Sequence, residues 1–520
     1  MTDATSVAVP LETPGEDSAD GGRWRPLLRR HWSWLVFAAV VVIGTAARYP
    51  GLHRKLIDRQ GFRQTQTAFT IRELAQHGMH LLHPPLPVLG PPWTVAMEFP
   101  LFQAIGALMV RAGLSSDVAG RLLGLMWFEA TALVLFVLVR RIASVRAALI
   151  AAVLFQAVPL NAQFGFASLM EYMATAGCLT SIYAVWKWFD GGRWWWLVAA
   201  GISSGVAFLT KVTTGASWMA PLVVLAFVVI RTDWRAQWRR VAIGLAAAPG
   251  VGVVLTEWWT HYSDAEKAAT PATAFLQSSK LWWWNSGPIS ERLNGGNEQL
   301  VLDRITNLMT GPWPLLVAAI VMLALARHNR LMKLSLVAVP LLGTQVFFNL
   351  YVHHDYYQCA LVPAYVSIMA IGIDEVAQRT TWRAALLRPA IAVAGLAGVL
   401  AGTWLSPIGS TVSQNLGMTW ETIPWQSQEL LDHTPRGSQI LTVGCHDWDS
   451  RYLYYGHRRG LMLPAPVSQD HQPMPLLTPE IVDANYQYVL SCAGKEYMDV
   501  LPIWLRLHWV APGLYKIIGT

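Results

Sequence analysis

The stretch DRQGFRQTQTAFTIRELAQHG, residues 58–78, decides how the rest of the chain is interpreted. It contains one Asp, three Arg, four Gln and three Thr, and it follows an almost wholly apolar run at 32–49. An apolar run of about 17–25 residues can cross a bilayer as a helix. The polar stretch therefore lies where a first membrane crossing ends, and the side of the membrane that it faces has to be determined.

The composition is that of a membrane protein. Hydrophobic residues make up 53% of the 520 residues and charged residues 14%, whereas soluble chains carry about 25% charged residues. The 26 Trp suit a chain whose indoles lie at headgroup level. The net charge of +7 comes from short segments between apolar runs, which excludes nucleic acid as the partner.

The apolar runs predict a polytopic α-helical membrane protein with about 11 transmembrane helices. The runs are 32–49, 117–138, 147–162, 169–187, 194–211, 216–231, 240–257, 312–327, 331–350, 358–374 and 388–406.

The charges between these runs alternate along the chain. One set of segments is rich in basic residues: 23–31, 140–146, 190–193, 231–240, 327–333 and 378–388. The other set consists of segments that are long or carry carboxylates: 50–116, 163–168, 212–215, 258–311, 351–357 and 407–520. Basic short loops mark the cytoplasmic side. We expect the N-terminus inside, the C-terminus outside, and residues 58–78 outside.

Three domains are predicted. Residues 1–22 have no signal-peptide core and are interpreted as a disordered cytoplasmic tail. Residues 23–406 form the membrane domain, and 407–520 form a small extracytoplasmic α/β domain. In this last domain, strands are expected at 438–444, 459–464, 486–492 and 513–519, and helices at 426–433 and 498–507. A disulfide between Cys445 and Cys492 is left open.

Two outer loops are long enough to carry a function. In loop 50–116, the apolar spacing over 67–78 predicts an amphipathic helix that lies on the membrane and ends at Gly78. A second interfacial helix is expected within 97–113. In loop 258–311, the Trp residues at 258, 259 and 282–284 are interpreted either as interface anchors or as part of a flexible lid.

Several ionisable residues are predicted at one level, the outer leaflet. Such groups are costly at membrane depth, so their clustering indicates a site. They are Asp58, Glu171, Lys211, His353, His354 and Asp355.

Each residue also has a simpler interpretation. Asp58 could form a surface ion pair with Arg59 and Arg63. Lys211 could extend to the headgroups, and Glu171 could be an inert partner of an Arg or a helix-capping residue. His353, Tyr356 and Tyr357 could be interfacial residues only.

The sequence lacks the signatures of ATP or zinc chemistry. It has no Walker loop and no GxGxxG motif, and the adjacent His353 and His354 do not make a zinc set. A divalent cation, Mg²⁺ or Mn²⁺, at Asp58 or Glu171 is left open.

Several motifs together resemble a known family. DRQGFRQTQTA, EFPLFQ, SLMEYMA, FLTKVTTG and HDYYQCALVP, with DWDSRYLYYGHRRG in the C-terminal part, resemble GT-C glycosyltransferases. The likeness is to the bacterial branch grouped with protein O-mannosyltransferases and the lipid A aminoarabinose transferase. One departure is that His83, Pro84 and Pro85 are present without the usual setting of the mannosyltransferase HPP motif.

The resemblance implies an enzyme of the bacterial plasma membrane. It implies transfer of a sugar from a polyprenyl-phosphate donor to an acceptor hydroxyl on the outer face, with inversion. The acceptor is a glycan, a lipid or a protein. The resemblance also implies that Asp58 is the general base and that Glu171 is a second acidic residue.

The chemistry of such a displacement suggests further roles, because it needs a base near the hydroxyl and cations near the departing phosphate. The donor phosphate is assigned to Arg63, Lys211, His354 and Tyr357. The sugar and the acceptor are assigned to Gln64, Gln66, Glu98, His353, Asp355 and Tyr356.

Two other classes of function are considered. One is a polysaccharide ligase or polymerase that uses lipid-linked glycans. The other is a transporter or flippase of lipid-linked sugars, which is disfavoured because no matching half-repeat with midplane polar residues is found.

Overall fold

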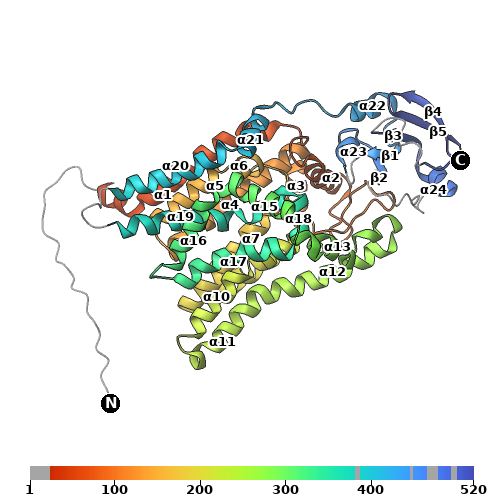
Figure 1. Cartoon of the computed structure of the whole chain (residues 1–520). Coiled ribbons are helices and arrows are strands. Elements are labelled where there is room, and N and C mark those ends of the chain that lie inside the picture. The colour runs from red at the N-terminus through yellow and green to blue at the C-terminus, as the bar shows by residue number, and fades with distance from the viewer. Residues whose placement is uncertain (1–23, 381–386, 446–448, 465–477, 493–500, 520) are drawn as a thin grey trace, which may run out of the picture.

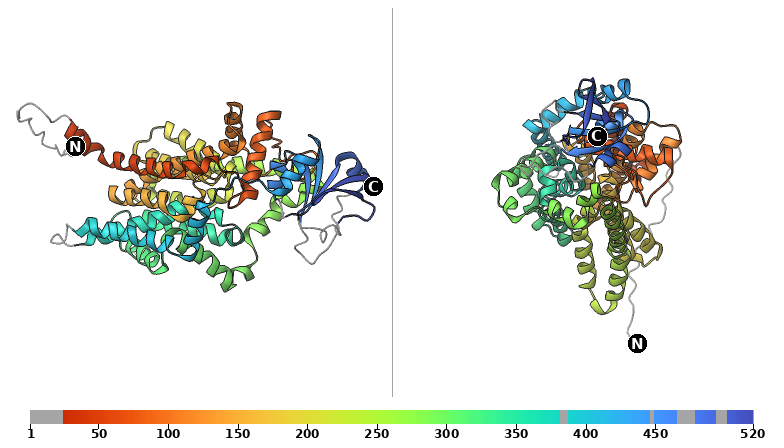
Figure 2. Two further views of the ribbon diagram at one scale, coloured as in Figure 1. Left: turned by 90° about the horizontal axis from the view of Figure 1, so that it is seen from above. Right: turned by 90° about the vertical axis from the view of Figure 1, so that its right-hand side faces the viewer.

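The computed structural model describes residues 24–380, 387–445, 449–464, 478–492 and 501–519. Helices form an elongated bundle, and a β-sheet domain lies beyond one end of it (Figure 1; Figure 2). The bundle contains α1 (Trp24–Arg48), α4 (Ser116–Ile142), α5 (Val145–Ala157), α6 (Pro159–Phe164), α7 (Glu171–Gly191), α8 (Trp195–Thr210), α9 (Val212–Ser217), α10 (Met219–Ile230), α11 (Trp234–Leu245), α12 (Val251–Ala269), α16 (Trp313–Ala324), α17 (Arg330–Val346), α18 (Phe348–His353), α19 (Val362–Arg379), α20 (Leu387–Trp404) and α21 (Pro407–Gly417).

Each of the eleven predicted apolar runs coincides with a helix or with consecutive helices of this bundle. By length and composition, five stretches of the described chain could each cross a membrane, and a sixth joins Gly295–Thr310 to Trp313–Ala324 through a 74° bend. The other apolar helices are shorter or interrupted. The structure therefore fits a helical membrane protein, while the count of 11 crossings and their orientation stay predictions.

Helix ends follow local chemistry. Ser115 and Ser144 accept hydrogen bonds from Val118 N and Ala147 N, and so cap the first turns of α4 and α5. Between α8 and α9 the chain is extended at Lys211 (φ −160°, ψ 95°). Lys211 therefore lies at a break between two helices and does not share the helical geometry of its neighbours.

The loop 50–116 contains α2 (Gly61–His77) and α3 (Leu101–Arg111). The helix predicted at 67–78 is present and ends at His77, with Gly78 as its C-cap. The prediction that it lies on the membrane surface is wrong, because α2 begins earlier and residues 63–74 are all buried. Helices α3 and α4 cover one side of α2, and α23 (Arg451–Tyr455) of the sheet domain covers another. A helix enclosed in this way can bury polar side chains only if they find partners.

The C-terminal region contains a five-stranded sheet of order β2-β1-β3-β5-β4. Strand β1 pairs in parallel with β2 and β3, and β5 pairs antiparallel with β3 and β4. The elements are α22 (Trp425–His433), β1 (Gln439–Cys445), α23, β2 (Arg459–Pro464), α24 (Pro479–Asn485), β3 (Tyr488–Ser491), β4 (Arg506–Ala511) and β5 (Leu514–Gly519).

The expected strands and the helix at 426–433 are present in this region. The helix expected at 498–507 is wrong within the described residues. There the chain is not helical at 501–505 and enters β4 at Arg506, because 506–511 pairs with β5 as a hairpin. The remainder of that expected helix, 498–500, lies outside the described residues.

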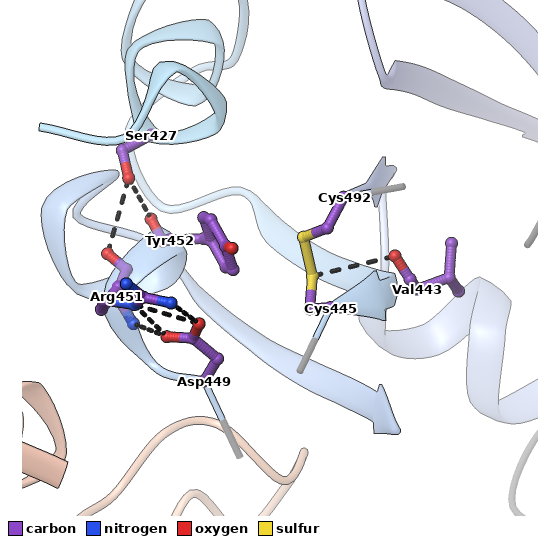
Figure 3. Close-up of a disulfide and its surroundings, with 7 residues drawn as sticks. All are labelled: Ser427, Val443, Cys445, Asp449, Arg451, Tyr452 and Cys492. Carbon is purple, nitrogen blue, oxygen red and sulfur yellow. Dashed lines mark hydrogen bonds and ion pairs between the residues drawn. A yellow bond between two sulfur atoms is a disulfide. The ribbon is translucent and has the colours of Figure 1, made fainter. Parts of the chain in front are cut away.

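A disulfide joins Cys445 at the end of β1 to Cys492 just after β3, with their Cα atoms 4.9 Å apart (Figure 3). It connects two adjacent parallel strands at the ends from which their loops leave.

Loop 258–311 is largely helical. It continues α12 and then forms η3 (Pro271–Leu276), α13 (Ser278–Ser286), α14 (Ile289–Arg292), α15 (Gly295–Ile305) and η4 (Thr306–Thr310). Arg292 donates to Ser286 O at 2.6 Å and Gln345 O at 3.1 Å, which ties α13 to the end of α17. The Trp residues at 258 and 282–284 are exposed, as interface anchors are expected to be, whereas Trp259 is buried.

Candidate functional site

A cavity of about 1330 Å³ lies between the ends of the bundle helices, the segment α12–α13 and the sheet domain. Nine of the twelve predicted site residues line it: Asp58, Arg63, Gln66, Glu98, Lys211, His353, His354, Tyr356 and Tyr357. The other three each bond to a lining residue: Gln64 to Asp58, Glu171 to Lys211 and Asp355 to Arg59. The structure therefore brings all twelve to one place.

Asp58 is fixed by two donors. Its Oδ1 accepts from Gln64 Nε2 at 2.6 Å and its Oδ2 from Arg121 Nη2 at 3.0 Å. The Arg121 side chain is fully buried, while that of Asp58 is 14% exposed toward the cavity. The interpretation of Asp58 as a surface partner of Arg59 and Arg63 is wrong, because those two cations pair elsewhere.

Arg63 and Glu98 form a second ion pair, with Nη2 and Oε1 2.6 Å apart. Arg63 also donates to Gln66 Oε1 at 3.0 Å. Burial opposes the charge on both groups, but their mutual attraction prevails. It raises the pKa of Arg63 and lowers the pKa of Glu98 relative to their ordinary values.

Lys211 and Glu171 form a third ion pair, and both side chains are at least 96% buried. The Lys211 Nζ lies 4.1 Å from the ring centroid of Tyr357 and 5.2 Å from that of Tyr356. The interpretation of Lys211 as a headgroup contact is wrong, because its ammonium lies inside the protein. Among the described residues, Glu171 Oε2 has no hydrogen-bond partner, so the carboxylate is not saturated by donors.

The HHDYY segment forms one wall of the cavity. Asp355 accepts from Arg59 Nε and Gln60 Nε2, each at 2.7 Å. Burial, with His353 and Lys211 nearby, lowers the pKa of His354 to about 4. His354 is therefore a neutral imidazole at pH 7, and not the cation expected beside a phosphate. The His353 ring stacks on Trp284 at 5.3 Å between centroids.

Sequence reasoning missed several residues of the site. Arg59 and Gln60 lie inside the opening stretch, and Arg121 is a lone cation at the start of an apolar run. Asp449 and Arg451 reach the cavity from the sheet domain. The position of a charged residue at one end of an apolar run could have indicated that Arg121 belongs to the site. No sequence pattern links Arg451 to Asp58.

The carboxylates at the cavity are engaged by cationic side chains. Asp58, Glu98, Glu171 and Asp355 are each paired with an Arg or Lys, and Oε2 of Glu171 has no hydrogen-bond partner among the described residues. A divalent cation at Asp58 or Glu171 therefore stays a prediction. In the described part of the chain, no group of three or more His, Cys, Asp or Glu side chains could hold a metal ion. His83 lies outside the cavity lining and pairs with Glu266 at 3.0 Å.

The bundle, the covered α2 and the C-terminal sheet domain together form the GT-C fold of membrane glycosyltransferases. The structure is similar to that of ArnT from Cupriavidus metallidurans bound to undecaprenyl phosphate, with TM-score 0.61 and 17% identity over 94% of this chain and 97% of that chain. It is also similar to the oligosaccharyltransferase AglB from Archaeoglobus fulgidus in complex with an inhibitory peptide and a dolichol-phosphate. For that pair the TM-score is 0.54 and the identity 12%, over 89% of this chain and 70% of that chain.

The sequence comparison is more local. The family model described as dolichyl-phosphate-mannose-protein mannosyltransferase matches residues 95–259. No curated protein sequence matches the chain closely enough to count as a relative. At these identities, the similarity to the solved structures establishes the fold and not the substrate.

Proposed function

We propose that the protein transfers a sugar from a polyprenyl-phosphate donor to an acceptor hydroxyl on the extracytoplasmic face of the bacterial plasma membrane. The observation that carries this proposal is the mixed lining of the cavity described above. Lys211 and Arg63 offer cations to a phosphate, whereas Trp282, Phe347 and Leu350 offer an apolar surface to a lipid chain. An amphiphilic ligand needs both kinds of wall.

Asp58 is the general base in this proposal. A bond forms between the acceptor hydroxyl oxygen and the anomeric carbon, while the bond from that carbon to the phosphate oxygen breaks. The hydroxyl proton passes to the carboxylate of Asp58, which Arg121 and Gln64 hold in one orientation. The electron pair of the broken bond leaves with the phosphate, as a single inverting displacement requires.

Lys211 and Arg63 stabilise the charge that develops on the departing phosphate. Glu171 is buried behind Lys211 and does not line the cavity. It therefore acts as a positioning residue for the ammonium and not as a second base. Tyr356 and Tyr357 flank the ammonium with their rings and limit where it can point.

The outer location is supported by the disulfide as well as by the charge pattern. Structural disulfides persist in oxidising compartments such as the bacterial periplasm, and Cys445–Cys492 lies in the sheet domain. The cavity opens beside that domain, so the donor would be used on the same side.

The direct test uses the purified protein in lipid nanodiscs. Undecaprenyl phosphate carrying single sugars is supplied together with extracted envelope glycans and lipids as acceptors, and released undecaprenyl phosphate is measured. We expect acceptor-dependent release with at least one sugar, and one added sugar per product by mass. Long added chains would indicate a polymerase. Binding and movement of the donor without release would indicate a flippase.

A further inference from the structure

The mechanism above leaves unused two charged residues that reach the cavity from the sheet domain, Asp449 and Arg451. All the residues assigned so far belong to the bundle and its outer loops. Burying the carboxylate of Asp449 has a desolvation cost, so its pairing with a partly exposed arginine at the edge of the cavity requires a reason.

The guanidinium of Arg451 is held by one carboxylate. Its Nε donates to Asp449 Oδ1 at 2.8 Å and Oδ2 at 3.0 Å, and its Nη2 donates to Oδ2 at 2.5 Å (Figure 3). Asp449 is fully buried, whereas the Arg451 side chain is 28% exposed. Among the described residues, Nη1 of Arg451 has no hydrogen-bond partner. One edge of the guanidinium, formed by Nε and Nη2, is thus fixed by Asp449, and Arg451 is one of the residues that line the cavity.

The backbone at Arg451 is fixed from two sides. Ser427 Oγ donates to Arg451 O at 3.5 Å and to Tyr452 O at 3.1 Å (Figure 3). Ser450 lies 2.7 Å from Thr65 Oγ1 and donates to Phe62 O at 3.1 Å, which joins the start of α23 to α2. The position of Arg451 over the cavity is therefore set by the fold and not by chance exposure.

Gly61 leaves room for this arginine. A Cβ added at Gly61 would lie 3.1 Å from Arg451 Cδ and 2.9 Å from Leu56 O, closer than side chains normally pack. Gly61 is three residues from Asp58, and Asp58, Gly61 and Arg451 all line the cavity.

We propose that Arg451, held by Asp449, contacts the substrate and binds hydroxyl oxygens of the sugar carried by the lipid-linked donor. This inference rests on the proposed function. In the proposed function, the lipid chain of the donor lies among the bundle helices and its phosphate contacts Lys211. The sugar of such a donor must then extend out of the bundle, toward the sheet domain. Arginine recognises paired oxygens there with a planar, oriented set of N–H donors.

The test compares binding of bare and sugar-bearing lipid to the full-length protein in nanodiscs. The probes are undecaprenyl phosphate alone and undecaprenyl phosphate carrying glucose, galactose, mannose or arabinose, with affinities measured by native mass spectrometry. In the wild type, one sugar-bearing probe should bind more tightly than the bare lipid. Arg451→Gln should reduce this sugar-dependent gain about tenfold and leave the affinity for the bare lipid unchanged.

Three further variants separate recognition from folding. Asp449→Asn should give a smaller loss, and Arg451→Lys should restore only part of the gain, because Lys lacks the planar fork. Arg459→Gln is the matched control. It removes a cation from the same segment that pairs with Glu73 at 2.7 Å and does not line the cavity. An intact Cys445–Cys492 bond, mapped by mass, reports that the sheet domain is folded in each variant.

Two results would overturn the inference while leaving the proposed function in place. One is an Arg451→Gln protein that keeps the whole sugar-dependent gain. The other is an equal loss of affinity for the bare and sugar-bearing lipids. If the wild type binds none of the lipids, the proposed function fails and this inference fails with it.

Discussion

Asp58 and Arg121 are joined by a 3.0 Å contact between Oδ2 and Nη2, which links the segment after the first helix to the start of α4. Arg121 also donates to Lys55 O at 2.7 Å, so one buried guanidinium fixes both the backbone that precedes Asp58 and its carboxylate. This relationship gives Asp58 a single orientation toward the cavity.

Replacing Asp58 by Asn should abolish transfer. General-base catalysis contributes about 10²–10⁴-fold in rate, and an amide cannot take up the hydroxyl proton. Release of undecaprenyl phosphate should therefore fall at least about 100-fold, with unchanged binding of the bare lipid. Asp190→Asn, at a surface ion pair with Arg141, is the control. Turnover at the normal rate would remove Asp58 as the base.

Lys211→Gln should destabilise the protein more than the double change Glu171→Gln/Lys211→Gln. Removing one partner of a buried ion pair leaves the other charge unpaired, at a cost of about 3–5 kcal/mol. Thermal melting in detergent measures the difference. Lys187→Gln is the control, since its 4.0 Å contact with Asp190 is half-exposed. Equal melting temperatures for the single and double variants would contradict the prediction.

The pH dependence of stability should include a contribution from His354. Because burial lowers its folded pKa from 6.5 to about 4, the unfolded chain binds the extra proton between these values. Stability is therefore complete above pH 6.5 and decreases by up to about 3 kcal/mol as the pH falls to 4.

Thermal melting between pH 7 and 4.5 tests this contribution. His354→Asn should melt with a shallower pH dependence than the wild type, and His508→Asn on β4 should behave like the wild type. Parallel curves for wild type and His354→Asn would show that the imidazole does not titrate in this way.

Tyr454→Phe should loosen the sheet domain from the bundle. The Tyr454 hydroxyl lies 2.5 Å from Asp117 Oδ1 and 2.6 Å from Ser116 Oγ, so it joins α23 to α4. Hydrogen bonds to charged groups contribute about 1.5–3 kcal/mol. Limited proteolysis between α21 and α22 should be faster in this variant than in the wild type or in Tyr515→Phe, on β5. Equal cleavage rates would mean that other contacts hold the domain.

The pair Cys445→Ser/Cys492→Ser should destabilise the sheet domain. Closing a loop with a sequence separation of 47 residues is worth about 4 kcal/mol in the chain-entropy model. A second experiment uses intact cells that make the wild-type protein. There, a membrane-impermeant thiol reagent should label Cys445 and Cys492 only after the disulfide has been reduced. Labelling without reduction, or protection after it, would contradict an outer, oxidised domain.

The sequence predicted the helical ranges well, because apolar runs and basic loop ends are local features. It also identified the acidic and basic residues at one level, such as Asp58, Lys211 and His354. It considered Arg59 and Arg63 as the partners of Asp58, and both of these cations pair with other carboxylates. Arg121 is 63 residues from Asp58, and no periodicity in one segment reveals which distant cation will approach it.

The errors at α2 and at 498–507 have the same origin. The prediction for α2 treated the helix as facing water or lipid, whereas the sheet domain covers it through Ser450 and Arg459. At 506–511, pairing with β5 determines a strand in a segment whose local pattern favoured a helix. Tertiary contacts from distant residues decided both cases.

The docking of α23 on α2 has a consequence for biogenesis. Thr65 and Ser450 are in contact although they are 385 residues apart, so α2 is covered only after a segment far along the chain has been made. Until residues 449–455 have been made and have packed on α2, this side of α2 has no cover and the cavity lacks the wall that Asp449 and Arg451 provide. A nascent or truncated chain therefore cannot hold a lipid-linked sugar in the proposed way, which restricts the reaction to fully assembled molecules.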